Sequence, residues 1–252
     1  MPDTAMSARL AAAGLDWVVP DWPAPANVHA VSTTRNGIGG AAIDFSPRCA
    51  GADAARSILR RLLPAEPNWL SQAHGRDVVS ADADWTRPPR ADAAVARAPA
   101  KVCTVLTADC LPVLFTDLEG SAVAAAHAGW RGLAAGVLEA TVDAMGVSPS
   151  SLLAWLGPAI GPRAFEVGTD VYVAFCDADP GASECFAARS PGKWHADLYA
   201  LARRRLARAE VTAVCGGGRC TFSERETFHS YRRGGAQASC RMATVVWREE
   251  LG

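Results

Sequence analysis

The sequence lacks the features that define several large classes of protein. It has no run of about 18 apolar residues, so we expect no membrane-spanning helix. Its 25 Lys and Arg do not exceed its 26 Asp and Glu, whereas a nucleic-acid-binding protein usually carries a basic excess. Asp3 and a short alanine-rich segment at the start do not resemble a secretory signal peptide. We therefore predict a cytoplasmic protein with no membrane and no nucleic-acid partner.

The residues that are present predict one folded domain. Half of the 252 residues are apolar, and a chain of this length buries roughly 70–75% of its unfolded surface. The eight cysteines include no Cys-x-x-Cys pair, so we expect reduced thiols. Predicted strands and helices mix without a regular βαβ rhythm, which indicates an α/β (α+β) fold of packed layers. We expect residues 1–26 to form a loosely packed N-terminal extension and residues 27–252 to form the domain.

Apolar spacing predicts the elements. Helices are expected at residues 52–63, 131–145, 170–176 and 197–209. Strands are expected at residues 28–33, 69–72, 77–81, 101–108, 111–116, 121–126, 152–156, 211–215 and 241–248. The Pro-, Arg- and Ala-rich residues 86–100 are expected to form a surface loop.

One predicted hairpin brings a thiol close to an imidazole. If its turn is symmetric and Thr116 faces Ser121, then Cys110 lies directly opposite His127. Opposed residues have Cβ atoms about 4.5–5.5 Å apart, which allows a thiolate and an imidazole to share one metal ion. Pro112 cannot donate a ladder hydrogen bond, so a bulge there would break this register. A buried cysteine beside a core histidine is the alternative interpretation.

A third ligand must come from another segment. His74 has the most favourable context, because it lies in a polar, glycine-containing link between two predicted strands. The other candidates are His29, His195 and His229. Two His and one Cys leave a fourth position for water or substrate, which is typical of a catalytic zinc site. The pair is also consistent with a metal-independent hydrolase in which Cys110 is the nucleophile and His127 its base.

The residues around this pair indicate proton and anion chemistry. Asp109 lies beside the thiol and would transfer protons or orient a ligand. A glycine-bearing turn after His127 leads into a predicted helix, whose N-terminus suits an anion such as phosphate. Candidate phosphate or base binders, expected to converge on one anion site, are Arg35, Arg76, Arg131 and Arg232. A solvated surface charge is the alternative for each.

Several long motifs occur in order along the chain. They are Ser-Thr-Thr-Arg at 32–35, Trp-Leu-Ser-Gln-Ala-His-Gly at 69–75, Thr-Ala-Asp-Cys-Leu-Pro-Val-Leu-Phe at 107–115, Ala-His-Ala-Gly-Trp-Arg-Gly at 126–132, Leu-Gly-Pro-Ala-Ile-Gly-Pro at 156–162, Phe-Glu-Val-Gly at 165–168, Arg-Cys-Thr at 219–221, Phe-His-Ser-Tyr-Arg-Arg at 228–233, and 235–243 with Arg241. Together they resemble the laccase-like polyphenol oxidase family, also called the YfiH-type or peptidoglycan editing factor family. Residues 36–49 depart from the family pattern, so substrate contacts from that loop are not carried over.

The resemblance implies a single-domain αββα sandwich with mixed sheets. It implies one metal ion, taken as Zn²⁺, held by His74, Cys110 and His127. It also implies a purine nucleoside phosphorylase that acts on adenosine, inosine and methylthioadenosine with phosphate, and that has adenosine deaminase activity. The protein would then be both a transferase and a hydrolase. Some bacterial members edit a peptidoglycan precursor, so an amidase acting on a muropeptide precursor is the alternative.

Copper chemistry, which the family name implies, fits the residue count poorly. A type 1 copper site uses two His and one Cys, and a further three-copper cluster needs many more imidazoles than the five histidines supply. We therefore expect no true multicopper oxidase chemistry. Cu²⁺ stays an alternative metal because it outranks zinc in affinity, and a weak copper-dependent polyphenol oxidase activity stays the least favoured alternative function.

Overall fold

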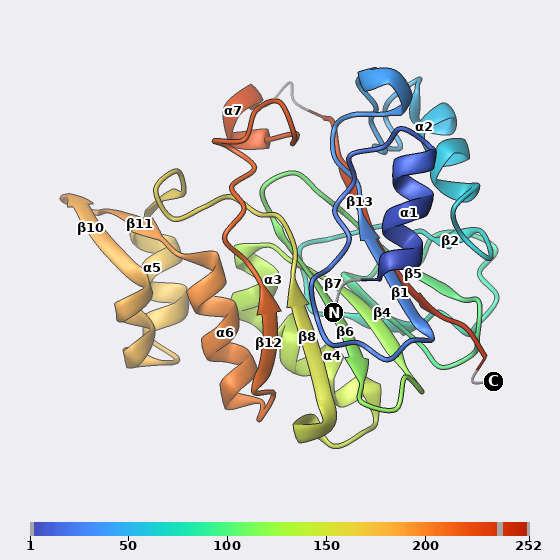
Figure 1. The fold of residues 1–252 in the computed structure, drawn as a ribbon. Coiled ribbons are helices and arrows are strands. Elements are labelled where there is room, and N and C mark those ends of the chain that lie inside the picture. Colours follow the sequence, from blue (N-terminus) through green and yellow to red (C-terminus); the bar gives the residue numbers. More distant parts are fainter. Residues whose placement is uncertain (1–2, 236–238, 251–252) are drawn as a thin grey trace.

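Two β-sheets pack face to face, with helices on both outer faces (Figure 1). The computed structural model describes residues 3–235 and 239–250. One sheet has the order β12 (Ala213–Gly216), β8 (Leu152–Leu156), β6 (Leu111–Asp117), β7 (Val123–Ala128), β4 (Ala93–Ala96), β3 (Val78–Ser80). The other has the order β1 (Val28–Ser32), β13 (Met242–Arg248), β5 (Val102–Thr107), β2 (Pro67–Asn68). Each contains parallel and antiparallel pairs.

The side chains of the central strands alternate between two apolar cores. On β6, Leu114 packs between the sheets, whereas Val113 and Phe115 pack against the helices outside the six-stranded sheet. On β13, Val246 packs between the sheets and Trp247 faces the opposite helices. This two-residue period is that of a strand covered on both faces. The expected αββα sandwich with mixed sheets is confirmed.

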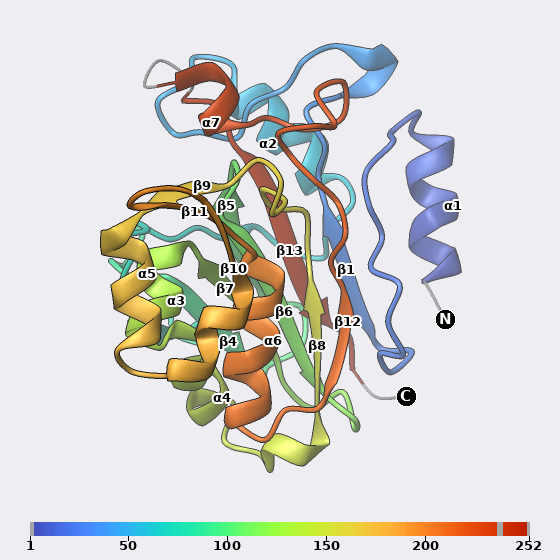
Figure 2. The same cartoon turned by 90° about the vertical axis from the view of Figure 1, so that its left-hand side faces the viewer.

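Helices cover both outer faces, as Figure 2 shows. The six-stranded sheet is covered by α3 (Trp130–Ala135), α4 (Val137–Met145) and α6 (Leu198–Arg208), and the four-stranded sheet by α1 (Thr4–Ala12) and α2 (Ala52–Arg60). The single helix expected at residues 131–145 is wrong. Gly136, with a φ of 93°, separates α3 from α4, because the left-handed conformation that Gly permits ends a helix.

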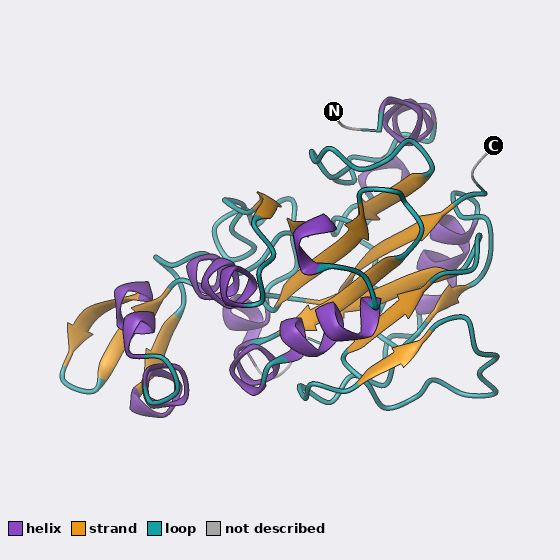
Figure 3. Cartoon of the chain, turned by 90° about the horizontal axis from the view of Figure 1, so that it is seen from below, coloured by secondary structure: helices purple, strands orange, loops and turns teal. Residues whose placement is uncertain are grey.

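A small lobe lies to one side of the sandwich (Figure 3). Its antiparallel sheet has the order β10 (Phe186–Ser190), β11 (Lys193–Ala196), β9 (Glu166–Gly168), accompanied by α5 (Thr169–Cys176) and the 3₁₀ segment η3 (Pro180–Cys185). Of these elements, only α5 was expected. Three further short elements are η1 (Ile38–Gly40), η2 (Pro149–Ser151) and α7 (Tyr231–Gly234).

Three other sequence expectations differ from the structure. Residues 3–26 are not loosely packed, because Met6 and Leu10 of α1 are buried in the apolar core between the four-stranded sheet and its helices. The domain boundary at residue 26 stays a prediction. Residues 86–100 are not only a surface loop, since they contain the buried strand β4. Residues 69–72 form no strand.

Among the described residues, no helix has the length and apolarity that a membrane span needs.

Candidate metal centre

His74, Cys110 and His127 bring their ligand atoms within 4.8 Å of one another. His74 lies in the loop between β2 and β3, Cys110 immediately precedes β6, and His127 lies on β7. His127 is buried, Cys110 is half-buried and His74 is exposed. Within 3–235 and 239–250, no other group of three such residues has metal-binding spacing. The structure thus brings together the three residues expected to bind a metal.

The hairpin that carries two of these residues has a different register from the predicted one. Pro112, and not Cys110, pairs with His127. The turn is wider because the Asp117 carboxylate accepts hydrogen bonds from the backbone N–H groups of Ser121 (2.8 Å) and Ala122 (2.9 Å). The register therefore moves by two residues, which leaves every side chain on its original face. Cys110 and His127 remain close, as diagonal and not direct neighbours.

Glycines make room for this arrangement. A Cβ atom on Gly129 would lie 2.8 Å from Cys110 Sγ and 3.3 Å from His74 Cδ2. One turn later, a Cβ atom on Gly132 would lie 2.7 Å from the carbonyl oxygen of Gly75. The start of α3 therefore packs directly against the thiol and the His74 loop.

Asp92, a residue that the sequence reasoning missed, joins the two histidines. His127 Nδ1 donates to Asp92 Oδ1 at 2.8 Å, which leaves Nε2 as the nitrogen available to a metal. The backbone N–H groups of Ala73, His74 and Gly75 donate to the same carboxylate at 3.1, 2.9 and 2.7 Å. Asp92 is 1% exposed. A signal was present, since Asp92 begins an Ala/Val run typical of a buried strand.

The thiol and the imidazole stabilise each other's charge. Burial raises the pKa of Cys110, but the positive charge of His127 and hydrogen bonds from His127 and His74 lower it below its ordinary value. Burial lowers the pKa of His127, but the Cys110 thiolate and Asp92 raise it above its ordinary value. Both shifts favour the charged forms, a Cys110 thiolate beside a His127 imidazolium. The thiolate is the form of cysteine that binds metals and attacks electrophiles.

Asp109 is held by three hydrogen bonds. Its Oδ1 accepts from Thr221 Oγ1 (2.6 Å), and its Oδ2 accepts from Ser230 Oγ (3.0 Å) and the backbone N–H of Arg232 (2.7 Å). It is 8% exposed, and its φ is 88°. These bonds tie the residue before Cys110 to the turn at Thr221 and to the start of α7. Both roles predicted for Asp109, proton transfer and orientation of a ligand, stay predictions.

The four predicted arginines do not all converge on one place. Arg232 contacts Asp109 through its backbone N–H, at 2.7 Å. Arg35 lies near Arg233: burial lowers the pKa of Arg233, and the positive charge of Arg35 lowers it further. Arg35 donates to the carbonyl of Arg225 at 2.9 Å. Arg232 donates to the carbonyl of Glu166 at 2.9 Å, and its guanidinium lies 5.5 Å from the ring centre of Phe165.

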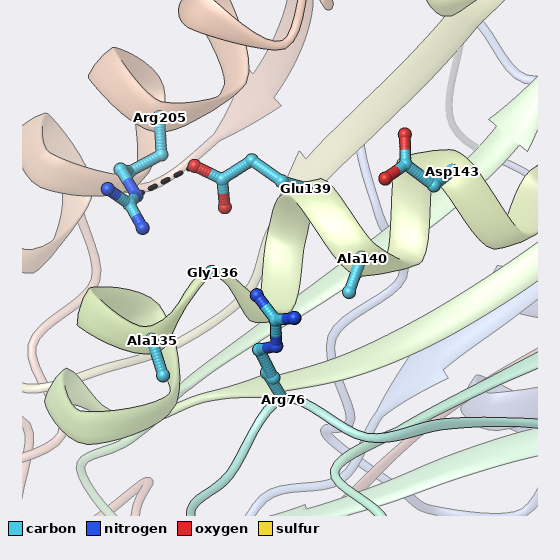
Figure 4. A pocket seen from close by; sticks show the side chains of 7 residues that line it. All are labelled: Arg76, Ala135, Gly136, Glu139, Ala140, Asp143 and Arg205. Atoms are coloured by element: carbon cyan, nitrogen blue, oxygen red, sulfur yellow. Dashed lines mark ion pairs between the residues drawn. The ribbon is translucent and has the colours of Figure 1, made fainter.

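Arg131 and Arg76 have other surroundings. The Arg131 guanidinium lies over the Trp130 ring at 4.3 Å. Arg76 points into a separate pocket of about 270 Å³ beside the Glu139–Arg205 ion pair (Figure 4). The roles of all four arginines in substrate binding stay predictions.

The three alternative histidines lie away from the candidate centre. His29 Nδ1 pairs with Asp3 at 2.5 Å. His229 donates to the carbonyl of Ile43 at 2.6 Å. His195 lies on β11, in the small lobe. His74 is therefore the histidine that joins the hairpin pair.

Known proteins are similar to this chain in sequence and in fold. The family model described as multi-copper polyphenol oxidoreductase laccase matches residues 49–249. A Pseudomonas aeruginosa protein named purine nucleoside phosphorylase PA4543 is 51% identical over 245 residues, which cover 93% of this chain and 99% of that protein. Escherichia coli purine nucleoside phosphorylase YfiH is 48% identical over 242 residues, which cover 91% of this chain and 98% of that one.

Solved structures give the same result. The crystal structure of Neisseria meningitidis protein NMB0706 matches with a TM-score of 0.88 and 46% identity, over 93% of this chain and 100% of that chain. The structure of YlmD from Geobacillus stearothermophilus matches with a TM-score of 0.82 and 27% identity, over 93% of this chain and 96% of that chain.

Proposed function

The chain belongs to the multi-copper polyphenol oxidoreductase laccase family, and we propose that it is a metal-dependent purine nucleoside phosphorylase. The observation that carries the proposal is the approach of the ligand atoms of His74, Cys110 and His127 to within 4.8 Å. Two relatives that the chain matches over nearly their full length are named purine nucleoside phosphorylases, which supports the substrate class. The proposed substrates are adenosine, inosine and methylthioadenosine, each with phosphate.

The donor set fits Zn²⁺. Two imidazoles and one thiolate are ligands that zinc prefers, and three protein ligands leave one position open. Asp92 fixes the ring of His127 so that Nε2 is available, and the thiolate of Cys110 is already favoured. A bound Zn²⁺ would supply a Lewis acid at the open position. Cu²⁺ is the alternative, since two His and one Cys also suit copper.

In the proposed reaction, a phosphate oxygen bonds to C1′ of the ribose as the bond from C1′ to the purine nitrogen breaks. The purine leaves with that electron pair and takes up a proton, and ribose 1-phosphate forms. The protein must orient a doubly charged anion. The proposed groups for this are the guanidinium groups of Arg35 and Arg232, which donate to the carbonyls of Arg225 and Glu166. In the proposed deaminase activity, water would add at C6 of adenosine and the 6-amino group would leave as ammonia, which gives inosine with a carbonyl at C6.

A second candidate is a metal-independent amidase acting on a muropeptide precursor. The specific observation in its favour is that Asp92 orients His127 through Nδ1 while His127 lowers the pKa of the Cys110 thiol. This is the order of groups in a nucleophile–base–acid triad. The two functions differ in their need for metal, because a bound metal would occupy the thiolate that the amidase needs as its nucleophile.

Product analysis with and without phosphate tests the proposal. We expect ribose 1-phosphate only when phosphate is present, loss of activity after chelation, and recovery with Zn²⁺. Cys110→Ser should abolish activity, and His195→Ala in the small lobe should leave it unchanged. Full phosphorolysis by metal-free protein would contradict the proposal. Cleavage of a muropeptide amide by metal-free protein, blocked by a thiol reagent, would favour the amidase.

A further inference from the structure

We propose that Asp92 is the positioning residue that preforms the metal site, because one carboxylate fixes two of the three ligands. This inference rests on the proposed metal site. Asp92 lies just before β4 and is 1% exposed. Its own backbone N–H donates to the carbonyl of Asp77 at 2.9 Å, so the carboxylate is presented from a fixed strand end.

The first ligand that Asp92 fixes is His74. The side chain of His74 is exposed, so packing alone does not hold it. Its φ is 59°, a left-handed conformation that is unfavourable for a non-glycine residue. Three successive backbone N–H groups, those of residues 73–75, converge on the Asp92 carboxylate. Convergent N–H groups of this kind need an anion between them, and Asp92 supplies it.

The second ligand is His127, which Asp92 holds at two points. The backbone N–H of His127 donates to the Asp92 carbonyl at 2.7 Å. Its ring Nδ1 donates to Asp92 Oδ1 at 2.8 Å. These bonds set the ring's rotation and its tautomer, which is the usual effect of a carboxylate behind a metal-binding histidine.

A neutral amide cannot replace this carboxylate. Oδ1 accepts from the His127 ring and from His74 N, whereas Oδ2 accepts from Ala73 N and Gly75 N. An asparagine has one acceptor oxygen and one NH₂ group. Whichever way the amide turns, its NH₂ faces two donors. Either the His74 loop or the His127 ring then loses hydrogen bonds to residue 92.

The test compares Asp92→Asn with Asp117→Asn. Asp117 is also buried and accepts three hydrogen bonds, but at the turn end of the β6–β7 hairpin. Zn²⁺ affinity is measured by competition with a chromogenic chelator, and the melting temperature is measured on metal-free protein. We expect Asp92→Asn to weaken Zn²⁺ binding about 10–100-fold. We expect Asp117→Asn to lower the melting temperature and leave Zn²⁺ affinity within twofold of the wild type.

A double variant shows whether Asp92 acts through the His74 loop. In a His74→Ala background, the loop no longer carries a ligand, so Asp92→Asn should weaken Zn²⁺ binding by a smaller factor than in the wild type. Equal factors in both backgrounds would mean that Asp92 acts through His127 alone, and would overturn the part of the inference that concerns His74.

The outcomes separate this inference from the proposed function. If wild-type protein binds no Zn²⁺, both are wrong. If the wild type binds one Zn²⁺ per chain and Asp92→Asn binds it equally well, only the inference is wrong. Should Asp92→Asn fail to melt cooperatively, Asp92→Glu takes its place, because it keeps the charge and moves it by one methylene. Wild-type Zn²⁺ affinity in a folded Asp92→Glu would likewise overturn the inference.

Discussion

At the scale of single residues, the candidate centre needs a glycine at position 129, where any side chain would collide with Cys110. Gly129, the N-cap of α3, adjoins Cys110 Sγ so closely that a Cβ atom would lie only 2.8 Å away. Gly51 holds the equivalent place before α2, and a Cβ atom there would meet only Cys49 Sγ, at 3.8 Å. Both glycines are the N-cap of a helix, but only Gly129 is packed too tightly to accept a Cβ atom.

We predict that Gly129→Ala displaces Cys110 and weakens Zn²⁺ binding. Overpacking of this kind costs about 1–3 kcal/mol of unfolding free energy, to be measured by urea denaturation together with chelator competition. The matched variant Gly51→Ala should change neither Zn²⁺ affinity nor, by more than about 0.5 kcal/mol, stability. Equal effects of the two substitutions would show that the contact with Cys110 is unimportant.

The sequence predicted that His74, Cys110 and His127 come together, and the structure brings their ligand atoms within 4.8 Å of one another. It did not predict Asp92, which supports two of them. Asp92 was missed because it follows a Pro- and Arg-rich stretch typical of a loop. Its partners lie 17–19 residues earlier and 35 residues later in the chain. Such contacts depend on the pairing of β4 with β3 and with β7, which a local pattern does not contain.

At the scale of elements, the break between α3 and α4 gives the site its short first helix. Gly136 adopts a φ of 93°, and the nearest atoms to a Cβ there would be at ordinary contact distances of 3.6–3.9 Å. A substitution at Gly136 is therefore limited by backbone strain and not by space.

We expect Gly136→Ala to lower the unfolding free energy by about 1–2 kcal/mol, the cost of the left-handed conformation for an alanine. Gly136→Asn should cost less, because asparagine tolerates that conformation better. Thermal melting of the two variants checks the order. A more stable Gly136→Ala would mean that α3 and α4 fuse into the continuous helix that the apolar spacing predicts.

The stabilisation that the ion pairs between α6 and the N-cap of η3 give to the fold should depend on pH. Hydrogen bonds from Arg204 and Arg208 lower the pKa of Asp179 below its ordinary value. A depressed folded-state pKa stabilises the fold above the unfolded pKa of about 3.9, and this stabilisation is lost as pH falls below it. Asp179→Asn should therefore be destabilised by a constant amount between pH 7 and 5, and the deficit should shrink below about pH 4.

Urea denaturation at several pH values measures this deficit. Asp177→Asn, on the exposed C-cap of α5, serves as the control for the loss of a carboxylate in the same region. A deficit for Asp179→Asn that stays constant down to pH 3 would contradict the assignment of the ion pair.

The predictions of elements were wrong where the structure does not follow from the periodicity of apolar residues. The hairpin register was wrong by two residues because the Asp117 carboxylate widens the turn. The lobe strands β10 and β11 were missed because β10 is largely exposed and carries no apolar alternation. The layered fold itself was predictable, since the long strands β6 and β13 are mostly apolar and are buried over their whole length.

At the scale of the whole molecule, the proposed metal would join three segments of the chain. The segments lie before β3, before β6 and on β7, and Asp92 adds a fourth at β4. A ligand that binds only the folded state stabilises it by mass action, by about 2.7 kcal/mol at a concentration 100 times its Kd.

We therefore predict that Zn²⁺ raises the melting temperature of metal-free protein by roughly 5–10 °C at that concentration. His74→Ala and Cys110→Ser should lose most of this shift, whereas His195→Ala should keep it. A shift that survives the loss of Cys110 would place the metal elsewhere.

The most direct test of the account is a titration of phosphorolysis with metal. Metal-free protein receives increasing Zn²⁺, and ribose 1-phosphate is measured with adenosine and phosphate as substrates. We predict activity that rises linearly and stops at one equivalent of Zn²⁺ per chain, and that is absent in Cys110→Ser. Full activity before any metal is added, or a rise that Cys110→Ser shares, would contradict the account.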